Sequence, residues 1–144
     1  MSPDAIREVA DRSIAAFNAG GDRDGYFTAL YEDDVVLHGY TPAPLEGIGA
    51  VRGFYDAIFA AFPDCRVATE QLLVDGDHLA WRFRFAGTHI GPFMSLPPSG
   101  LPFDVPGITI LRFGEARCAE RWSVADFLTL MMQIGAVPPP DPSP

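Results

Sequence analysis

Positive charge is scarce in this 144-residue sequence, which has 10 Lys and Arg against 19 Asp and Glu and a net charge of −9. A surface this acidic repels nucleic-acid phosphates and anionic lipids, so we expect no nucleic-acid partner and no membrane partner. Apolar runs are too interrupted for a membrane span, and the polar residues 1–8 do not resemble a secretion signal. These absences predict a cytoplasmic protein.

Cysteine is equally sparse. Cys65 and Cys118 are not spaced as a redox or zinc motif, so we expect two buried, reduced thiols. The three histidines are scattered without the short spacing that zinc sites use. The sequence therefore predicts no metal site.

Hydrophobic residues make up 48% of the chain, and 11 of them are Phe. This stock can build one core and line a pocket without help from disulfides. We expect a single domain over residues 1–137 and a Pro-rich mobile tail over residues 138–144, where proline excludes regular structure.

Apolar spacing indicates helices first and strands afterwards. Ser2 and Pro3 open a helix that Gly20 and Gly21 end, Asp22 caps a second short helix, and a third follows Gly49 up to Phe62. Such an order is typical of an α+β fold. The expected strands are residues 35–40, 66–74, 78–88, 103–113 and 117–122, with a Gly/Pro-rich loop at 89–102 and a closing helix at about 124–134.

The expected strand 78–88 has two distinct faces. Leu79, Trp81, Phe83 and Phe85 share one face, and the arginines Arg82 and Arg84 lie on the other with two alanines. One face can pack against helices, which leaves the other for a cavity or a partner interface.

Several segments, read in order, resemble one family. The two most informative are Gly87-Thr88-His89-Ile90-Gly91 and the closing Trp122-Ser123-Val124-Ala125-Asp126, followed by Gln133-Ile134-Gly135. Phe62-Pro63-Asp64, Pro98-Ser99-Gly100 and two N-terminal segments, residues 18–22 and 31–38, add to the pattern. Together these segments resemble the SnoaL-like polyketide cyclases over roughly residues 9–138.

The resemblance implies a curved antiparallel sheet that three N-terminal helices wrap into a cone, with an internal apolar pocket and a short C-terminal helix. This fold is similar to that of ketosteroid isomerase and the nuclear transport factor. It also implies a homodimer that pairs through the sheet, a hydrophobic polyketide-like ligand, a role in antibiotic biosynthesis, and ring closure without a cofactor.

Asp126 is the acid/base that the resemblance implies. Burial beside Trp122 and Phe127 would raise its pKa from the usual value of about 3.9 towards the working range. The alternative is structural, because Ser123 and Asp126 have a Ser-x-x-Asp spacing close to a capping box for the last helix.

His89, His38 and Arg82 are the other candidate polar groups. A neutral histidine can donate to a developing enolate oxygen or relay a proton, and an inward arginine can hold a carbonyl or carboxylate. The alternatives are histidines that satisfy backbone groups and an arginine in a salt bridge on the outer sheet surface. The expected substrate-binding wall is formed by Trp122, Trp81, Phe54, Phe62, Phe93 and Met94.

Three functions remain open on the sequence. The first is a cyclase that closes a ring in a polyketide-derived intermediate, by an aldol or by another closure in which the cavity enforces a shape. The second is an isomerase or an epoxide hydrolase of the same fold, which would gather Asp126, Arg82 and Asp34 around one water. The third is a non-catalytic binding module, because a fold alone does not establish catalysis.

Overall fold

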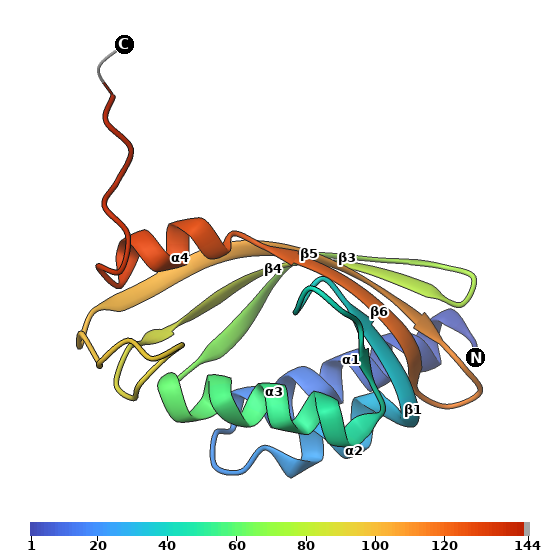
Figure 1. Cartoon of the computed structure of the whole chain (residues 1–144). Helices are drawn as coiled ribbons and strands as arrows, with labels where there is room; N and C mark the ends of the chain where they lie inside the picture. The colour runs from blue at the N-terminus through green and yellow to red at the C-terminus, as the bar shows by residue number, and fades with distance from the viewer. Residues whose placement is uncertain (143–144) are drawn as a thin grey trace.

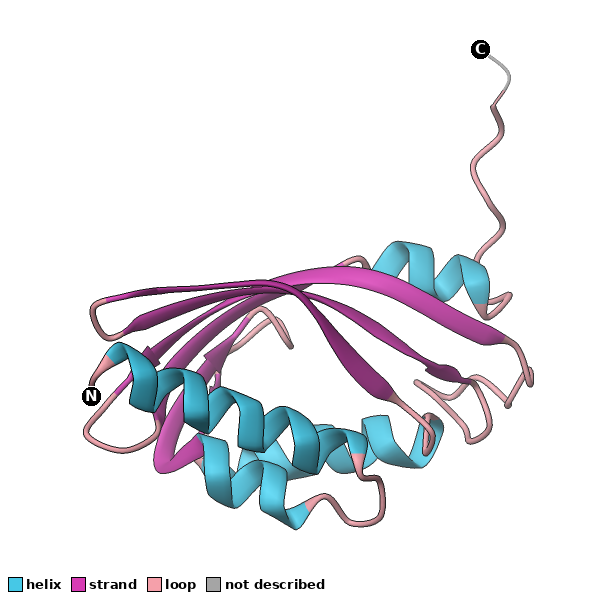
Figure 2. Cartoon of the chain, turned by 180° about the vertical axis from the view of Figure 1, so that it is seen from behind, coloured by secondary structure: helices cyan, strands magenta, loops and turns pink. Residues whose placement is uncertain are grey.

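The structure is a computed structural model, and it describes residues 1–142 of the chain. A strongly curved six-stranded sheet arches over a layer of helices, with one further helix at the end of the sheet remote from the N-terminus (Figures 1 and 2). This is the α+β architecture predicted from the sequence. No helix of the described residues is both long enough and apolar enough to span a bilayer.

The three N-terminal helices are α1 (Pro3–Asn18), α2 (Asp24–Leu30) and α3 (Ile48–Ala61), and they cover the concave face of the sheet (Figure 1). The Ser2 hydroxyl caps α1 by accepting from the Ala5 amide at 3.1 Å, as the sequence predicts. Gly20 and Gly21 follow α1 with positive φ angles of 76° and 67°, a conformation that ends helices and suits glycine.

The strands are β1 (Tyr31–His38), β2 (Leu45–Glu46), β3 (Arg66–Asp75), β4 (His78–Thr88), β5 (Pro102–Phe113) and β6 (Cys118–Ala125). Their order in the sheet is β2-β1-β6-β5-β4-β3. The predicted antiparallel sheet is correct for β3 to β6, but β1 pairs with β6 in parallel, so the sheet is mixed. A parallel neighbour is possible because most of the chain separates the two strands.

The closing helix is shorter than predicted. It is α4 (Phe127–Gln133), because β6 continues to Ala125 and Ser123 and Val124 remain in the ladder with β5. Residues 138–142 form neither helix nor strand, and residues 143 and 144 of the predicted tail lie outside the described residues.

The loop between β4 and β5 is fixed to the rest of the fold. Thr88 donates its amide and its hydroxyl to the two carboxylate oxygens of Asp64, at 2.8 and 2.7 Å. Ile90 and Gly91 both donate to the carbonyl oxygen of Ala61 at the end of α3. The Gly-Thr-His-x-Gly motif is therefore a structural joint between the sheet and α3.

We predict that Gly91→Ala destabilises the protein. A Cβ at Gly91 would overlap the carbonyl oxygen of Ala60, which as backbone cannot move aside, and forced overlaps of this kind cost about 1–3 kcal/mol. Gly53→Ala is the matched control, because a Cβ there meets nothing within 4 Å and alanine is favoured over glycine in a helix by about 0.5–1 kcal/mol. Urea unfolding should show a lower midpoint for Gly91→Ala and a higher midpoint for Gly53→Ala than for the wild type. Equal stability of both variants would contradict the close approach of Gly91 to the Ala60 carbonyl.

Candidate functional site

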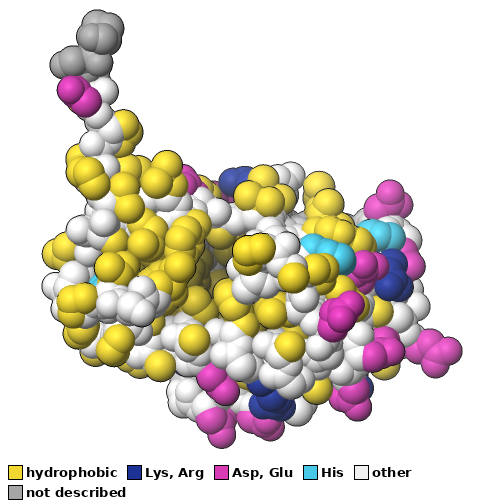
Figure 3. Space-filling model, in the orientation of Figure 1, with side chains coloured by type: hydrophobic (Ala, Val, Ile, Leu, Met, Phe, Trp, Pro, Cys, Tyr) yellow, Lys and Arg dark blue, Asp and Glu magenta, His cyan; other side chains and the backbone are white. Residues whose placement is uncertain are grey.

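A cavity of about 780 Å³ lies between the concave face of the sheet and the helical layer. The inward side chains of β4, namely Leu79, Trp81, Phe83 and Phe85, form part of its wall, as the two-faced pattern of this strand predicts. Figure 3 shows apolar side chains around the hollow in this face of the molecule. The volume and the apolar wall are those of a small-molecule site.

Five of the six predicted wall residues line the cavity: Trp81, Phe54, Phe62, Phe93 and Met94. Trp122 does not. It lies on the convex face of the sheet, 38% exposed, with its ring stacked on His38 at 5.5 Å between centroids. Because residues alternate along a strand, its neighbours Arg121 and Ser123 point inward instead.

The polar end of the cavity is a cluster that we call the Arg121 cluster. It consists of Arg121, the four tyrosines of the chain, Thr109 and Ser123. Its members come from α2 (Tyr26), β1 (Tyr31), the turn after β1 (Tyr40), α3 (Tyr55), β5 (Thr109) and β6 (Arg121 and Ser123). The cluster therefore joins the helical layer to the sheet.

The guanidinium of Arg121 is the centre of this cluster and is only 3% exposed. Its Nη1 donates to the hydroxyls of Tyr31 at 2.6 Å and Tyr26 at 3.0 Å, and its Nε donates to the Thr109 hydroxyl at 2.9 Å. Its Cζ lies 5.9 Å from the ring centroids of both Tyr40 and Trp81. Within residues 1–142, neutral oxygens and ring faces, rather than a carboxylate, surround this cation.

The hydroxyls of the cluster form a chain with one direction. Thr109 donates to the carbonyl oxygen of Trp122 at 2.9 Å, and a carbonyl can only accept. The Ser123 hydroxyl, 2.6 Å away, must then donate to Thr109, and the Tyr40 hydroxyl must donate to Ser123 at 3.0 Å.

The remaining tyrosine hydroxyls continue this row of hydrogen bonds in the same direction. Tyr55 donates to Tyr40 at 3.3 Å, and Tyr26 donates to Tyr55 at 3.2 Å. The proton of Tyr26 is thereby used, so Tyr31 donates to Tyr26 across 2.7 Å. Six hydroxyls thus run from Tyr31 to Thr109, and Arg121 donates to both ends of the run.

Burial keeps these phenols neutral. It raises the pKa of Tyr26, Tyr31, Tyr40 and Tyr55 above the usual value, against the opposing effect of the nearby Arg121 charge. A guanidinium stays protonated in proteins. The site is therefore a fixed cation with neutral hydroxyl donors in an apolar enclosure, which is an arrangement that stabilises negative charge on a ligand.

Asp126 does not lie in the cavity wall. It is exposed and is the N-cap of α4, where its carboxylate accepts from the Thr129 amide at 3.0 Å and from the Thr129 hydroxyl at 2.7 Å. These bonds, with the hydroxyl contributing most, lower the pKa of Asp126. The expectation that burial raises this pKa is wrong, and the capping alternative applies with Asp126 itself, rather than Ser123, as the cap.

The other predicted polar groups also lie away from the cavity. His38 of β1 is part of the convex face, where its Nε2 lies 2.8 Å from a carboxylate oxygen of Glu120. Arg82 of β4 donates to Glu70 at 2.9 Å in a surface salt bridge. Asp34 is exposed on β1. The structure therefore does not gather Asp126, Arg82 and Asp34, and no carboxylate lines the cavity among the described residues.

His89 is buried in the β4–β5 loop rather than in the cavity wall. Its Nδ1 accepts from the Ser99 amide at 3.1 Å, so the ring proton is on Nε2. That Nε2 has no hydrogen-bond partner among residues 1–142, and the Phe62 ring packs against the imidazole at 5.9 Å. The backbone-satisfying alternative therefore describes His89.

Cys65 and Cys118 are free and buried, as predicted, and burial raises the pKa of their thiols to about 11 and about 12. A raised pKa leaves little thiolate, the nucleophilic form, at neutral pH. In the part of the chain that the structure describes, no three His, Cys, Asp or Glu side chains are grouped to hold a metal ion.

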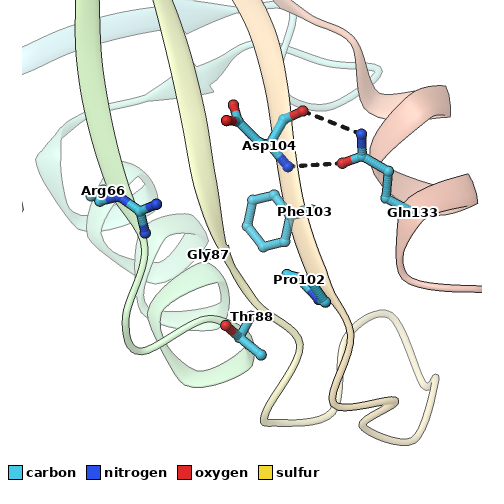
Figure 4. A pocket seen from close by; sticks show the side chains of 7 residues that line it. All are labelled: Arg66, Gly87, Thr88, Pro102, Phe103, Asp104 and Gln133. Carbon is cyan, nitrogen blue, oxygen red and sulfur yellow. Dashed lines mark hydrogen bonds between the residues drawn. The ribbon is translucent and has the colours of Figure 1, made fainter.

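A second, shallower depression lies outside the cavity, where α4 meets β5 (Figure 4). The Gln133 side chain accepts from the Asp104 amide at 2.8 Å and donates to the Asp104 carbonyl at 3.3 Å. This amide pair fixes α4, whose Leu130 lines the cavity, to the sheet. The Gln-Ile-Gly segment of the sequence motif thus positions one wall of the cavity.

Sequence reasoning missed the Arg121 cluster. The large apolar side chain of Trp122 predicts an inward position, and alternation along the strand then puts Arg121 on the outer face. The available signal was β5, where Thr109, Leu111 and Phe113 alternate with exposed positions and face Arg121 and Ser123 across the ladder. The four tyrosines are too far apart in sequence to be recognised as a group.

A family model described as SnoaL-like polyketide cyclase matches residues 4–134. No curated protein sequence matches the chain.

Solved structures match over nearly the full length. A provisionally named SnoaL-like polyketide cyclase from Jannaschia sp. CCS1 is 26% identical with a TM-score of 0.82, and 96% of this chain and 98% of that one are covered. TsrD from Streptomyces laurentii is 26% identical with a TM-score of 0.83, covering 95% and 99%. IdmH from Streptomyces antibioticus, provisionally named a polyketide cyclase, is 28% identical with a TM-score of 0.76, covering 90% and 97%.

A protein with a ketosteroid isomerase-like fold from Catenulispora acidiphila is 20% identical with a TM-score of 0.75, and the match covers 95% of this chain and 96% of that one. At this identity the match concerns the fold alone, and it confirms the cone predicted from the sequence.

We predict that none of the tyrosines ionises in the native protein until well above pH ~10, where exposed phenols titrate. All four belong to the cluster, so absorbance at 295 nm reports on it alone. The phenols of the unfolded chain ionise first. The contribution of the four buried phenols to the free energy of unfolding is therefore fully present below pH ~10 and is lost as the pH rises beyond it. The urea-unfolded chain is the control; a native titration that matches it would contradict burial of the phenols.

Proposed function

The chain belongs to the SnoaL-like polyketide cyclase family, and we propose that it closes a ring in a polyketide-derived natural-product intermediate without a cofactor. The observation that carries the proposal is the apolar cavity with one cationic, hydroxyl-rich end. Its volume of about 780 Å³ suits a folded chain of polyketide size, and its wall offers aromatic faces on several sides.

The cavity supports ring closure first by shape. Aromatic walls from α3, β4 and the β4–β5 loop hold a flexible chain with its two reacting carbons close together. Holding reactants in this way contributes several powers of ten to a ring closure. The loop is hydrogen-bonded to the end of α3 through the amides of Ile90 and Gly91, which supports this part of the wall.

The Arg121 cluster supports the closure electrostatically. In an aldol closure, an enolate carbon attacks a carbonyl carbon of the same chain, and negative charge moves from one oxygen to the other. Tyr40, Tyr55 and Arg121 line the cavity and can donate to the oxygen that carries this charge. The walls are mainly apolar, so each such bond is stronger than in water.

A second candidate chemistry has less support. An epoxide hydrolase would use two carboxylates and an arginine around one water, and the predicted set does not meet in the cavity. A non-catalytic binding module needs only the cavity, so a turnover measurement separates it from the cyclase.

The test is turnover of linear polyketide-like substrates, followed by mass spectrometry of the products. We expect Ala57→Trp to reduce the rate about tenfold or more, because Ala57 is exposed where the cavity opens and the indole would obstruct it. Ala50→Trp is the matched control: it is exposed on the same helix and does not line the cavity. Binding without any product would favour the binding module.

Asp126→Ser belongs in the same experiment. Serine keeps an oxygen that can cap α4 but removes the carboxylate. An unchanged rate is expected if Asp126 is only the cap, and a folded variant with a large loss of rate would restore Asp126 as the acid/base.

We further propose that the protein is a homodimer that pairs through the convex face of the sheet. This face carries Leu73, Ile108, Ile110, Trp122 and Val124, whose exposed fractions lie between 38 and 76%. The salt bridges Arg82–Glu70 and Arg84–Asp104 are on the same side of the sheet. An apolar patch within a charged border is typical of a protein interface.

Sedimentation velocity tests the dimer. Ile108→Glu places a charge in the middle of the patch and should give monomers, whereas Leu128→Glu, at a similarly exposed position on α4, should remain dimeric. A wild-type protein that is monomeric at every concentration would refute the interface.

A further inference from the structure

The only charged side chain in the cavity wall, among the described residues, is Arg121. It forms no salt bridge with any residue between 1 and 142. A buried cation without a counter-ion is costly, because phenol dipoles replace only part of its lost hydration. The positive end of the cavity is therefore complementary to a negative ligand group.

The guanidinium also has donors in reserve. It carries five N–H groups, and the hydrogen bonds of the described residues use only Nε and Nη1. Nη2 makes no hydrogen bond within residues 1–142. Arg121 lines the cavity, so a ligand oxygen there can accept a hydrogen bond from Nη2.

The hydroxyl chain can respond to such an oxygen. Tyr40 is half-buried at the cavity and donates to Ser123, an interaction that a rotation about its C–O bond redirects to a ligand. Tyr55 and Tyr26 donate towards Tyr40 in sequence, with Arg121 donating to Tyr26 at the far end. Bonds aligned in this way polarise one another and strengthen the last donor.

From these observations we propose that the Arg121 cluster is an oxyanion site and that the ligand is an apolar molecule with an acidic enol or phenol, bound as its anion. The O–H bond of the ligand breaks, its electron pair stays on the ligand oxygen and its proton goes to solvent water. The inference rests on the proposed function and deepens it: the substrate class is one whose reacting part is a 1,3-dicarbonyl or a phenol.

Substituted 2-naphthols with solution pKa values on both sides of neutrality are suitable probes, because naphthol and naphtholate differ in absorbance. We expect the wild type to bind naphtholate at least about tenfold more tightly than naphthol, which lowers the pKa of the bound naphthol by one unit or more. 2-Naphthoate is the parallel probe that distinguishes a carboxylate site from an aryl-oxyanion site. Tighter binding of naphthoate than of naphtholate would overturn the assigned ligand class.

Arg121→Gln should abolish the preference for the anion. Arg82→Gln is the matched control, because it removes the same charge from the outer sheet surface and should leave the preference unchanged. Tyr55→Phe, which removes one donor and no charge, should reduce the preference about threefold to tenfold, and it provides the test if Arg121→Gln does not fold.

Equal binding of both naphthol forms, no binding of either, or an equal loss in Arg82→Gln would overturn the proposal. The ring-closure assay separates the two hypotheses. Turnover without an anion preference would refute the oxyanion site and leave the cyclase standing. An anion preference without turnover would refute the cyclase and leave the oxyanion site standing.

Discussion

The buried guanidinium of Arg121 is the constraint around which this fold is arranged. A charge placed between a sheet and a helical layer is tolerated only when polar groups reach it from both sides. Arg121 donates to hydroxyls from α2, β1 and β5, and Tyr55 of α3 accepts from the α2 tyrosine, so each of these elements must be correctly placed for the cation to be stable. The same requirement leaves a polar end in an otherwise apolar cavity.

The motif residues that identify the family in sequence serve the scaffold. Thr88 and Gly91 join the sheet to α3, Asp126 caps α4, and Gln133 fixes α4 to β5. Each satisfies backbone groups or allows a close approach, which explains why a particular residue type is needed there. The walls and the polar end, by contrast, come from residues that form no recognisable motif.

The sequence predicted the elements well because their signals are local. Helix α1 follows from its cap, its apolar spacing and its two glycines, and the limits of β4 follow from alternation and a turn. The end of β6 was predicted too early, because Ser123 and Val124 resemble the start of a helix. Their place in the ladder depends on β5, a partner that a local pattern does not reveal.

The site was predicted only in its apolar part. Aromatic residues at strand and helix positions indicated a wall, and five of six lie there. The polar candidates Asp126, His89, His38 and Arg82 are exposed or structural. Residue type indicates which chemistry a side chain can perform, but it does not indicate whether the fold turns that side chain inward. Arg121 and its neighbour Trp122 point to opposite faces of β6, and which of the two points inward depends on the pairing of β6 with β1 and β5, which has no local signal in the sequence.

The hydrogen bonds of Arg121 also bear on the order in which the protein is made. Its phenol partners Tyr26 and Tyr31 precede it by 95 and 90 residues. Contacts between such distant segments form late, after the loops between them have closed. During synthesis, the helical layer is therefore made before β6 supplies the guanidinium that its tyrosines surround. Until β6 is in place, the cavity has no cation at its polar end.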